Sequence, residues 1–165
     1  MLEDTRRTME RMRPYSPTYR TTYGQMFEGR CEDILAAPPV IKLKGKTHLI
    51  FTSPPFPLNR KKKYGNLQGE EYVAWLSSLA PLLCDYLAPK GSIVIEMGNA
   101  WVPGSPTMST LPIKARLGFL EAGNLHLCEE FICFNPARLP SPAEWVTVRR
   151  ERVKDAFTRV WWMCP

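Results

Sequence analysis

The stretch Thr47–Phe56, "THLIFTSPPF", joins a short apolar segment to a loop that contains two consecutive prolines. The β-branched and aromatic residues of "HLIF" favour a buried strand, which Pro54 ends because proline has no backbone N–H to donate. Proline also keeps the residue before it out of the helical region, so Ser53 and Pro54 are held extended with little help from packing. The sequence therefore predicts a stiff loop directly after a strand.

The chemistry of this loop suits a planar ring that carries an amino group. Prolines offer carbonyl acceptors but no donors, Ser53 adds a hydroxyl, and Phe56 adds an aromatic face. Acceptors for both hydrogens of an exocyclic amine help its lone pair to attack an electrophile, and losing one such contact typically costs about 3–4 kcal/mol of barrier. Stacking of a base on Phe56 is worth roughly 1–3 kcal/mol.

Composition limits the class of protein. A chain of 165 residues with 44% hydrophobic residues fits one globular domain, and a formal charge of +6 favours a polyanionic partner. Five cysteines without a CxxC pair, together with two histidines, indicate reduced thiols and no metal site. We find no apolar leader and no stretch long enough to cross a bilayer, and we expect a cytoplasmic protein that is not attached to a membrane.

Residues 1–18 are polar, basic and bounded by prolines, which is typical of a mobile arm. "CEDILAAP" predicts one or two helical turns stopped by Pro38 and Pro39. "EEYVAWLSSLAPLLCDYL" and "TLPIKARLGFLEAGN" have helical spacing, with a kink or late break expected at Pro81 and a C-terminus at Gly123. "GSIVIEM", "HLCEEFICF" and "FTRVWWM" predict strands.

This alternation of strands and helices predicts an α/β fold with a mainly parallel sheet. Ligands of such sheets bind beyond the carboxyl ends of the strands, which directs attention to the loops after "HLIF" and "IVIE". Four large aromatic residues lie on helix or strand periodicity, so we expect them in the core: Trp75, Phe119, Trp161 and Trp162.

Four motifs, in order and at matching spacing, carry a family resemblance. "TSPPF", "NRKKKYGNLQGEEYVAWL", "GSIVIEMGNAWVPGSP" and "NPARLPSPAEWVTVRRERVKDAFTRVWW" resemble the amino-group DNA methyltransferases of restriction-modification systems, especially the PvuII-type cytosine-N4 enzymes. The resemblance runs from about Tyr19 to the last residues. It implies transfer of a methyl group from S-adenosylmethionine, without a metal, to N4 of a cytosine flipped out of double-stranded DNA.

The resemblance assigns roles within the loop. Ser53 and the carbonyl of Pro54 accept hydrogen bonds from the amine, Pro55 keeps the loop rigid, and Phe56 stacks on the flipped base. Glu96, in "VIEMGN", occupies the family's acidic position, where it orients Ser53 or the base. The alternative for Glu96 is an ordinary surface carboxylate at a strand end.

The candidate DNA contacts lie in two further segments. A basic run directly follows the catalytic loop, where phosphates flanking an extruded base would pass, and its residues are Arg60, Lys61, Lys62, Lys63 and Tyr64. Asn135 and Trp145 lie in the proline-stiffened "NPARLPSPAEW", where positioning of the cytosine and a purely structural turn are both open interpretations. The cluster "RRERVKD" has a weaker claim, because Glu151 and Asp155 can pair with its cations.

One departure from the family pattern is large. The glycine-rich turn that cradles the cofactor is absent, so only Thr52 and Ser53 are candidates for contacts at the cofactor's edge. Residues 19–165 then correspond to the catalytic half of a methyltransferase domain, a partial Rossmann-like sheet without its cofactor half. If the missing half supplies the central strands, the sheet has an open edge and an uncovered apolar face.

The sequence therefore predicts a cytosine-N4-specific DNA methyltransferase in a truncated or split form, with a second polypeptide as a candidate source of the cofactor half. An adenine-N6 enzyme is the nearest alternative, because both amines pose the same geometrical problem. A non-catalytic DNA-binding remnant is the alternative from another class.

Overall fold

The structure is a computed structural model that describes residues 16–56 and 67–165. The chain divides into two compact units, of which the second is Gly45–Pro165. In the first unit, β1 (Tyr19–Arg20) and β2 (Gln25–Met26) pair antiparallel, and the short helices α2 (Cys31–Leu35) and α3 (Pro38–Ile41) follow. We expected Pro38 and Pro39 to end a helix. They also begin the next one, α3, because the first helical positions need no backbone donor.

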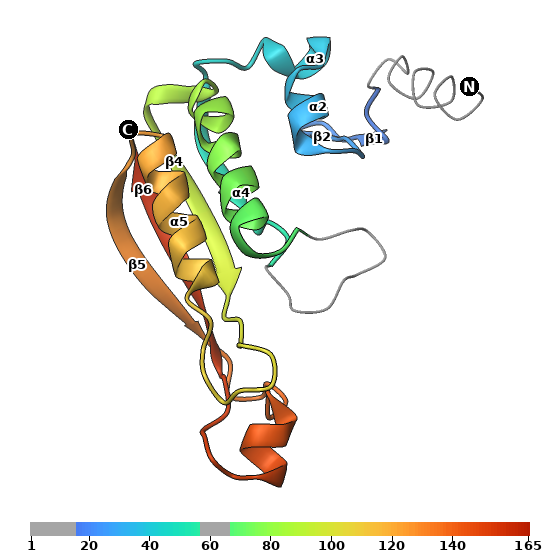
Figure 1. The fold of residues 1–165 in the computed structure, drawn as a ribbon. Helices are drawn as coiled ribbons and strands as arrows, with labels where there is room; N and C mark the ends of the chain where they lie inside the picture. Colours follow the sequence, from blue (N-terminus) through green and yellow to red (C-terminus); the bar gives the residue numbers. More distant parts are fainter. Residues whose placement is uncertain (1–15, 57–66) are drawn as a thin grey trace, which may run out of the picture. The chain divides into compact units, whose positions relative to one another are not determined.

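The second unit carries the sheet and its two helices (Figure 1). Both long helices and the predicted strands after Gly45 are confirmed, with Pro81 inside the first long helix and Gly123 at the end of the second. Their bounds are β3 Thr47–Thr52, α4 Gly69–Cys84, β4 Leu87–Gly98, α5 Leu111–Ala122, β5 His126–Phe134 and β6 Phe157–Cys164, with a π-helical turn η1 at Glu144–Val148. None of the described helices is long and apolar enough to cross a membrane.

The four strands are arranged in the order β3-β4-β6-β5, and the sheet is mixed. Only β3 and β4 are parallel, whereas β6 runs antiparallel to both of its neighbours. The expectation of a mainly parallel sheet is therefore wrong for the described residues. The reason lies in the connection from β5 to β6, which contains a single helical turn and no crossover helix, so the chain returns antiparallel.

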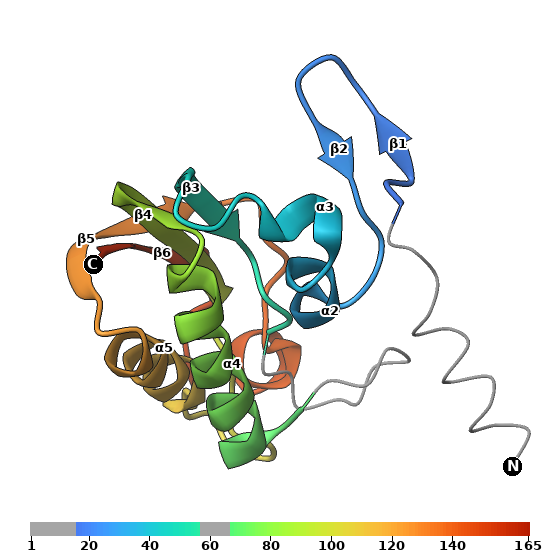
Figure 2. The same ribbon diagram turned by 90° about the horizontal axis from the view of Figure 1, so that it is seen from above.

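The helices α4 and α5 lie side by side on one face of this sheet, as the two views in Figure 1 and Figure 2 show. Alternate residues of β4 and β6 point towards them and are almost fully buried. The predicted core positions of Phe119 and Trp161 are confirmed, and half-buried Trp75 packs against the same cluster. The cluster includes Tyr72, Leu76, Leu79, Ile93, Ile95, Met97, Ala115, Phe119, Leu125, Trp161 and Met163.

A buried ionic cluster sits among these apolar residues. The guanidinium of Arg116, on α5, is 2% exposed and lies 4.5 Å from the centre of the Trp161 ring. Its Nη1 is 3.9 Å from Oε1 of Glu130, which also accepts a hydrogen bond of 2.8 Å from Arg159. Burial lowers the pKa of Arg116 to about 10, although the charge of Glu130 acts in the opposite direction. The Nε of Arg116 donates a hydrogen bond of 3.2 Å to the carbonyl of Pro112.

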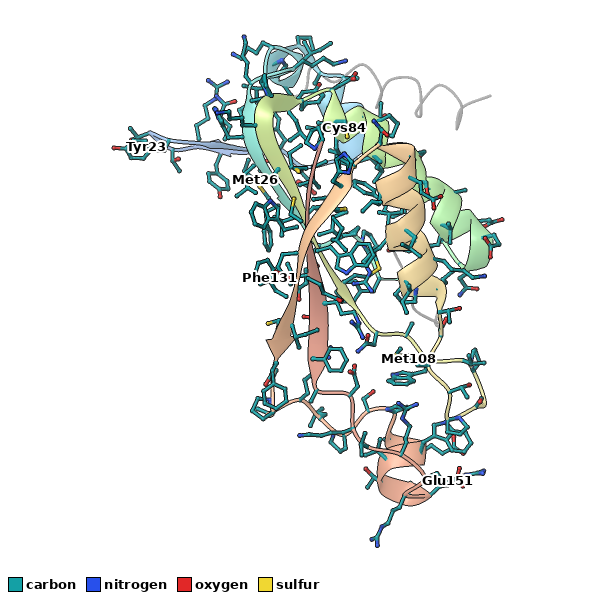
Figure 3. All side chains as sticks on the ribbon, turned by 90° about the vertical axis from the view of Figure 1, so that its left-hand side faces the viewer. Tyr23, Met26, Cys84, Met108, Phe131 and Glu151 are labelled. Carbon is teal, nitrogen blue, oxygen red and sulfur yellow. The ribbon has the colours of Figure 1, made fainter. Side chains whose placement is uncertain are left out.

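Neither α4 nor α5 covers the opposite face of the sheet (Figure 3). Trp162 points to this face and is 40% exposed, so its predicted core position is wrong. Its neighbours Trp161 and Met163 fill the side of the sheet under the helices, and the alternation of a strand sends Trp162 the other way.

Candidate active site

The loop Thr52–Phe56 leaves β3 beside the carboxyl end of β4. Because the two strands are parallel and Thr52 pairs with Ile95, Ser53 and Glu96 come at neighbouring levels of the sheet. Ser53 and Pro55 are exposed, whereas Pro54 is buried. The structure thus brings the predicted loop and the predicted carboxylate to the same end of two adjacent strands.

Phe56 is anchored to the fold and is not a freely exposed ring. It is half-buried, packs against the hydrophobic core and covers Gly98 at the end of β4. A methyl group at Gly98 would lie 2.9 Å from the nearest carbon of the Phe56 ring, too close for an unstrained contact. Gly98 is therefore a site residue that the sequence reasoning missed, and its only signal was a glycine that follows a buried strand.

Glu96 is half-buried, and its Oε1 accepts a hydrogen bond of 2.9 Å from Oγ1 of Thr158 on β6. Thr158 pairs with Gly98 in the register of the two strands, so the hydroxyl belongs to the same end of the sheet. This contact fixes one carboxylate oxygen beside the loop. Thr158 lies 62 residues from Glu96, and no local pattern in the sequence marks it.

A polar cluster fastens the connection between β5 and β6 to the end of β4. Asn99 donates a hydrogen bond of 2.8 Å to Oδ1 of Asp155, and Arg138 forms an ion pair of 3.1 Å with Oδ2. The same guanidinium donates to the carbonyl of Phe157 at 2.8 Å. We expected Asp155 to pair with the cations of its own "RRERVKD" cluster. Arg138 pairs with it instead, because the hairpin brings residues 138 and 155 opposite each other.

Arg152 joins the same connection to the loop that follows β4. Its guanidinium lies 3.5 Å from the centre of the Trp101 ring and donates to the carbonyl of Pro106. These contacts join the loop after β4 to the segment between β5 and β6. They also give Arg152, which belongs to the "RRERVKD" cluster of candidate DNA contacts, partners within the protein. Arg152, Trp101 and Asn99 were all missed as positioning residues, since each acts across a long sequence separation.

Asn135 and Trp145 lie in this connection. Oδ1 of Asn135 accepts a hydrogen bond of 3.0 Å from the N–H of Ala137, and its own N–H donates to Ala156. Trp145 begins the turn η1 together with Glu144, is half-buried, and has the guanidinium of Arg149 4.6 Å from its ring centre. Both residues therefore have a structural function, and their role at a base stays a prediction.

One group of predicted DNA contacts cannot be located in the described part of the chain. The basic run Arg60, Lys61, Lys62, Lys63 and Tyr64 lies outside them. Within residues 16–56 and 67–165, no three His, Cys, Asp or Glu side chains gather in a way that could hold a metal ion.

The class of protein follows from this fold, this site and a family comparison. The model of a family described as DNA methylase, covering the amino-group N6 and N4 enzymes, matches residues 47–163, from the start of β3 almost to the end of β6. The match spans more than half of the chain. The chain belongs to this family of DNA methylases.

The particular relatives agree with this class. The type II methyltransferase M.PvuII of Proteus hauseri is 41% identical over 146 residues, which are 88% of this chain and 42% of the relative. The solved PvuII DNA methyltransferase, described as cytosine-N4-specific, superposes with a TM-score of 0.76 at 40% identity, covering 89% of this chain and 51% of that one. This chain therefore spans about half the length of these relatives.

A more distant structure supports the fold alone. A DNA modification methylase from Thermus thermophilus, solved in complex with S-adenosyl-L-methionine, superposes with a TM-score of 0.51 at 18% identity, covering 73% of this chain and 46% of that one. The shared arrangement of strands and helices thus extends beyond the PvuII relatives.

Proposed function

We propose that this chain is the catalytic part of a cytosine-N4-specific DNA methyltransferase. The observation that carries the proposal is the loop Thr52–Phe56 at the carboxyl ends of β3 and β4, in a chain that belongs to the DNA methylase family. Cytosine is the proposed base because the solved relative at 40% identity is described as cytosine-N4-specific. The proposed substrate is a cytosine rotated out of double-stranded DNA.

In this proposal, two acceptors prepare the amine for attack. The Ser53 hydroxyl and the Pro54 carbonyl accept its two hydrogens, so the nitrogen lone pair leaves conjugation with the ring and points at the methyl donor. Pro55 limits the freedom of the loop, and Phe56, held by the core and by Gly98, offers its remaining face to the base. Glu96, oriented by Thr158, positions the amine or Ser53.

The proposed methyl donor is S-adenosylmethionine. When bound, it would supply an activated methyl group to the amine nitrogen, with the electron pair of the broken bond to carbon left on its sulfur and one amine proton lost to solvent. The described residues fit the amine side of this reaction but do not by themselves fit the cofactor. Gly98, the last residue of β4, faces the Phe56 ring, which fills the space beside its Cα.

Among the described residues, Thr52 and Ser53 are our candidates for contacts at the cofactor's edge. The solved relative has a further portion that this chain does not cover, and we assign the rest of the cofactor site to a polypeptide segment equivalent to that portion. A second polypeptide is one source of that part.

The proposed DNA contacts are the basic run Arg60–Tyr64, Asn135 and Trp145. Cations that directly follow the Thr52–Phe56 loop in the sequence would neutralise phosphates on either side of the extruded nucleotide, which adds affinity that falls as salt rises. This term is independent of base sequence, so it would hold the duplex without choosing the recognition site.

The test is a nucleoside analysis by mass spectrometry. Duplex DNA is incubated with S-adenosylmethionine, this chain and the unmatched part of the Proteus hauseri methyltransferase, and we expect N4-methylcytosine. Ser53→Ala should reduce the rate about 100-fold or more while DNA affinity changes little. Ser78→Ala is the matched control, because its exposed hydroxyl donates to the Trp75 carbonyl within α4.

Three outcomes decide against parts of the proposal. N6-methyladenine without N4-methylcytosine would reverse the assignment of the base. Full activity of Ser53→Ala would refute the role of Ser53. DNA binding without methylation by the completed protein would favour a non-catalytic DNA-binding module.

A further inference from the structure

Two cysteine side chains from neighbouring strands lie against each other at one end of the sheet. Cys128 on β5 donates a hydrogen bond to Cys164 on β6, with 3.1 Å between the two sulfur atoms, although 36 residues separate them in the chain. All five cysteines are free thiols, in agreement with the reduced state that we expected from the sequence. The sequence did not indicate this pair, because the contact depends on the pairing of β5 with β6.

A β-bulge brings the Cys128 side chain to this position. The register of β5 and β6 shifts between Leu127 and Glu129, so Cys128 is the extra residue of the bulge. A bulged residue bends its strand and turns its side chain out of the regular alternation. Cys164 is paired with His126, two positions before Cys128 on the neighbouring strand. The bulge thus lets the sulfur of Cys128 reach across to Cys164.

The two sulfur atoms need only a small movement to become bonded. The sulfur atoms of a disulfide lie about 2.05 Å apart, so this pair is about 1 Å from bonding distance. Both residues belong to paired strands, and the hydrogen bonds between β5 and β6 therefore hold the two backbones together. Cys128 is exposed and Cys164 is half-buried, which makes Cys128 the thiol that meets solvent first.

The chemistry of this pair differs from that of a single reactive cysteine. A catalytic thiol has a lowered pKa, produced by a nearby cation, a metal or a helix N-terminus. The pKa of Cys128 is instead raised above its ordinary value, mainly because its thiol donates the hydrogen bond to Cys164. Cys128 is therefore not arranged as a nucleophile for a separate substrate, and its position favours reaction with the neighbouring thiol.

We propose that Cys128 and Cys164 form a reversible dithiol site, which exchanges with small disulfides and closes into a disulfide between β5 and β6. Cys128 loses its proton and attacks one sulfur of the small disulfide, and the other sulfur leaves as a thiolate. Cys164 loses its proton in turn, attacks the Cys128 sulfur of this mixed disulfide and displaces the second small thiolate. The protein gives up two electrons and two protons, and the small disulfide is reduced to two thiols.

This site is independent of the proposed function. Because β6 runs antiparallel to β4, Cys164 lies at the end of the sheet opposite Gly98 and the Thr52–Phe56 loop. A bond there ties β6 to the edge strand β5 without touching the loop. It closes a loop of 36 residues in the unfolded chain, which should raise the melting temperature by roughly 5 °C or more. It also protects both thiols from further oxidation, which is irreversible beyond the sulfenic acid.

The experiment equilibrates the full chain with a mixture of reduced and oxidised glutathione and identifies the products by mass spectrometry without reduction. Closure of the pair removes two hydrogen atoms from the intact mass, whereas a mixed disulfide adds a glutathione. Digestion after glutamate separates Cys128 from Cys133, because Glu129 and Glu130 lie between them. We expect the peptides that contain Cys128 and Cys164 to be joined.

The variants test which thiols take part. Cys128→Ser and Cys164→Ser should each abolish the joined peptides. Cys133→Ser is the matched control, because Cys133 is an exposed thiol on the same strand that is paired with Thr158, and this variant should close like the unmodified chain. In urea the sulfur atoms lose their proximity, so the ratio of closed to open pair should fall roughly 10-fold or more.

Three outcomes would overturn the proposal. The first is a mixed disulfide at Cys128 that does not go on to an internal bond. The second is an equal closed fraction in urea and in the folded chain, since the fold would then contribute nothing to the pair. The third is a joined product that melts at a lower temperature than the reduced chain, because the bond would then distort the sheet.

Discussion

The two faces of the sheet differ most clearly where neighbouring residues of one strand point in opposite directions. Trp161 is 7% exposed under α4 and α5, whereas Trp162 is 40% exposed on the opposite face. On β5 the contrast is inverted, because the carboxylate of Glu130 points to the helices while Phe131 points away from them. Under α4 and α5 the central strands form a core, whereas the opposite face of the sheet carries exposed apolar side chains.

This difference shows that the hydrophobic pattern alone does not locate the core of this sheet. Glu130 is tolerated inside because Arg159 and the indole N–H of Trp161 donate to it. Phe131 is 51% exposed because it points away from α4 and α5, the helices that cover the other face.

The largest effect is expected from the adjacent tryptophans. Trp161→Ala should cost about 3–5 kcal/mol of unfolding free energy, because it leaves a cavity and removes contacts to Arg116 and Glu130. Trp162→Ala should cost less than about 1 kcal/mol in the isolated chain. Urea unfolding measures both. Equal losses would mean that the two faces are equally packed, and the comparison would be wrong.

The next effect concerns the segment that connects β5 to β6 at the end of the sheet. Asp155→Ala removes acceptors for Asn99 and Arg138 and leaves their donors without that carboxylate. We expect a loss of roughly 1.5–3 kcal/mol, since hydrogen bonds to a charged group are involved. Hydrogen exchange should show faster opening in residues 135–156 than in α4. Uniform acceleration throughout the second unit would contradict a local role.

A smaller effect is expected where the end of β4 meets the Thr52–Phe56 loop. Gly98→Ala places a methyl group 2.9 Å from the Phe56 ring, which must shift, at a cost of about 1–2 kcal/mol. Gly104→Ala tests a different mechanism, because Gly104 has open space around it but a φ of +69°. A crystal structure of Gly98→Ala should show a displaced ring. An unmoved ring with unchanged stability would refute the close packing.

The smallest effect is a pH dependence of the covered face. The pKa of Glu130 lies below its usual value of 4.5, mainly because Arg159 donates a hydrogen bond to it. The stabilisation is therefore present above that usual value and is lost as the pH falls through the lower folded pKa. Because the side chain is 34% exposed, we expect less than about 1 kcal/mol.

Melting temperatures measured from about pH 5 down to about pH 3 should fall less steeply for Glu130→Gln than for the unmodified chain. The same slope for both would show that this carboxylate does not contribute.

The helices, most strands and the loop could be predicted because their signals are local. The 3.6-residue spacing of α4 and α5, Gly123 at a helix end and the two prolines after β3 each act within a few residues. The direction of β6 and the outward position of Trp162 could not be predicted in this way. They depend on which strand lies beside β4 and on which face the helices cover, and both are decided by long-range packing.

The sequence by itself determined the stiff loop Thr52–Phe56 after β3, because its two prolines act locally, whereas Glu96 as a site residue and the expectation of an open apolar face came from the resemblance to DNA methyltransferases. Only the tertiary structure decided that the Phe56 ring packs against Gly98 and that Thr158 donates a hydrogen bond to Glu96. It also decided that Asn99 and Arg138 both bind the carboxylate of Asp155. These contacts join residues far apart in the chain, and they form only when strand order and register bring the residues together.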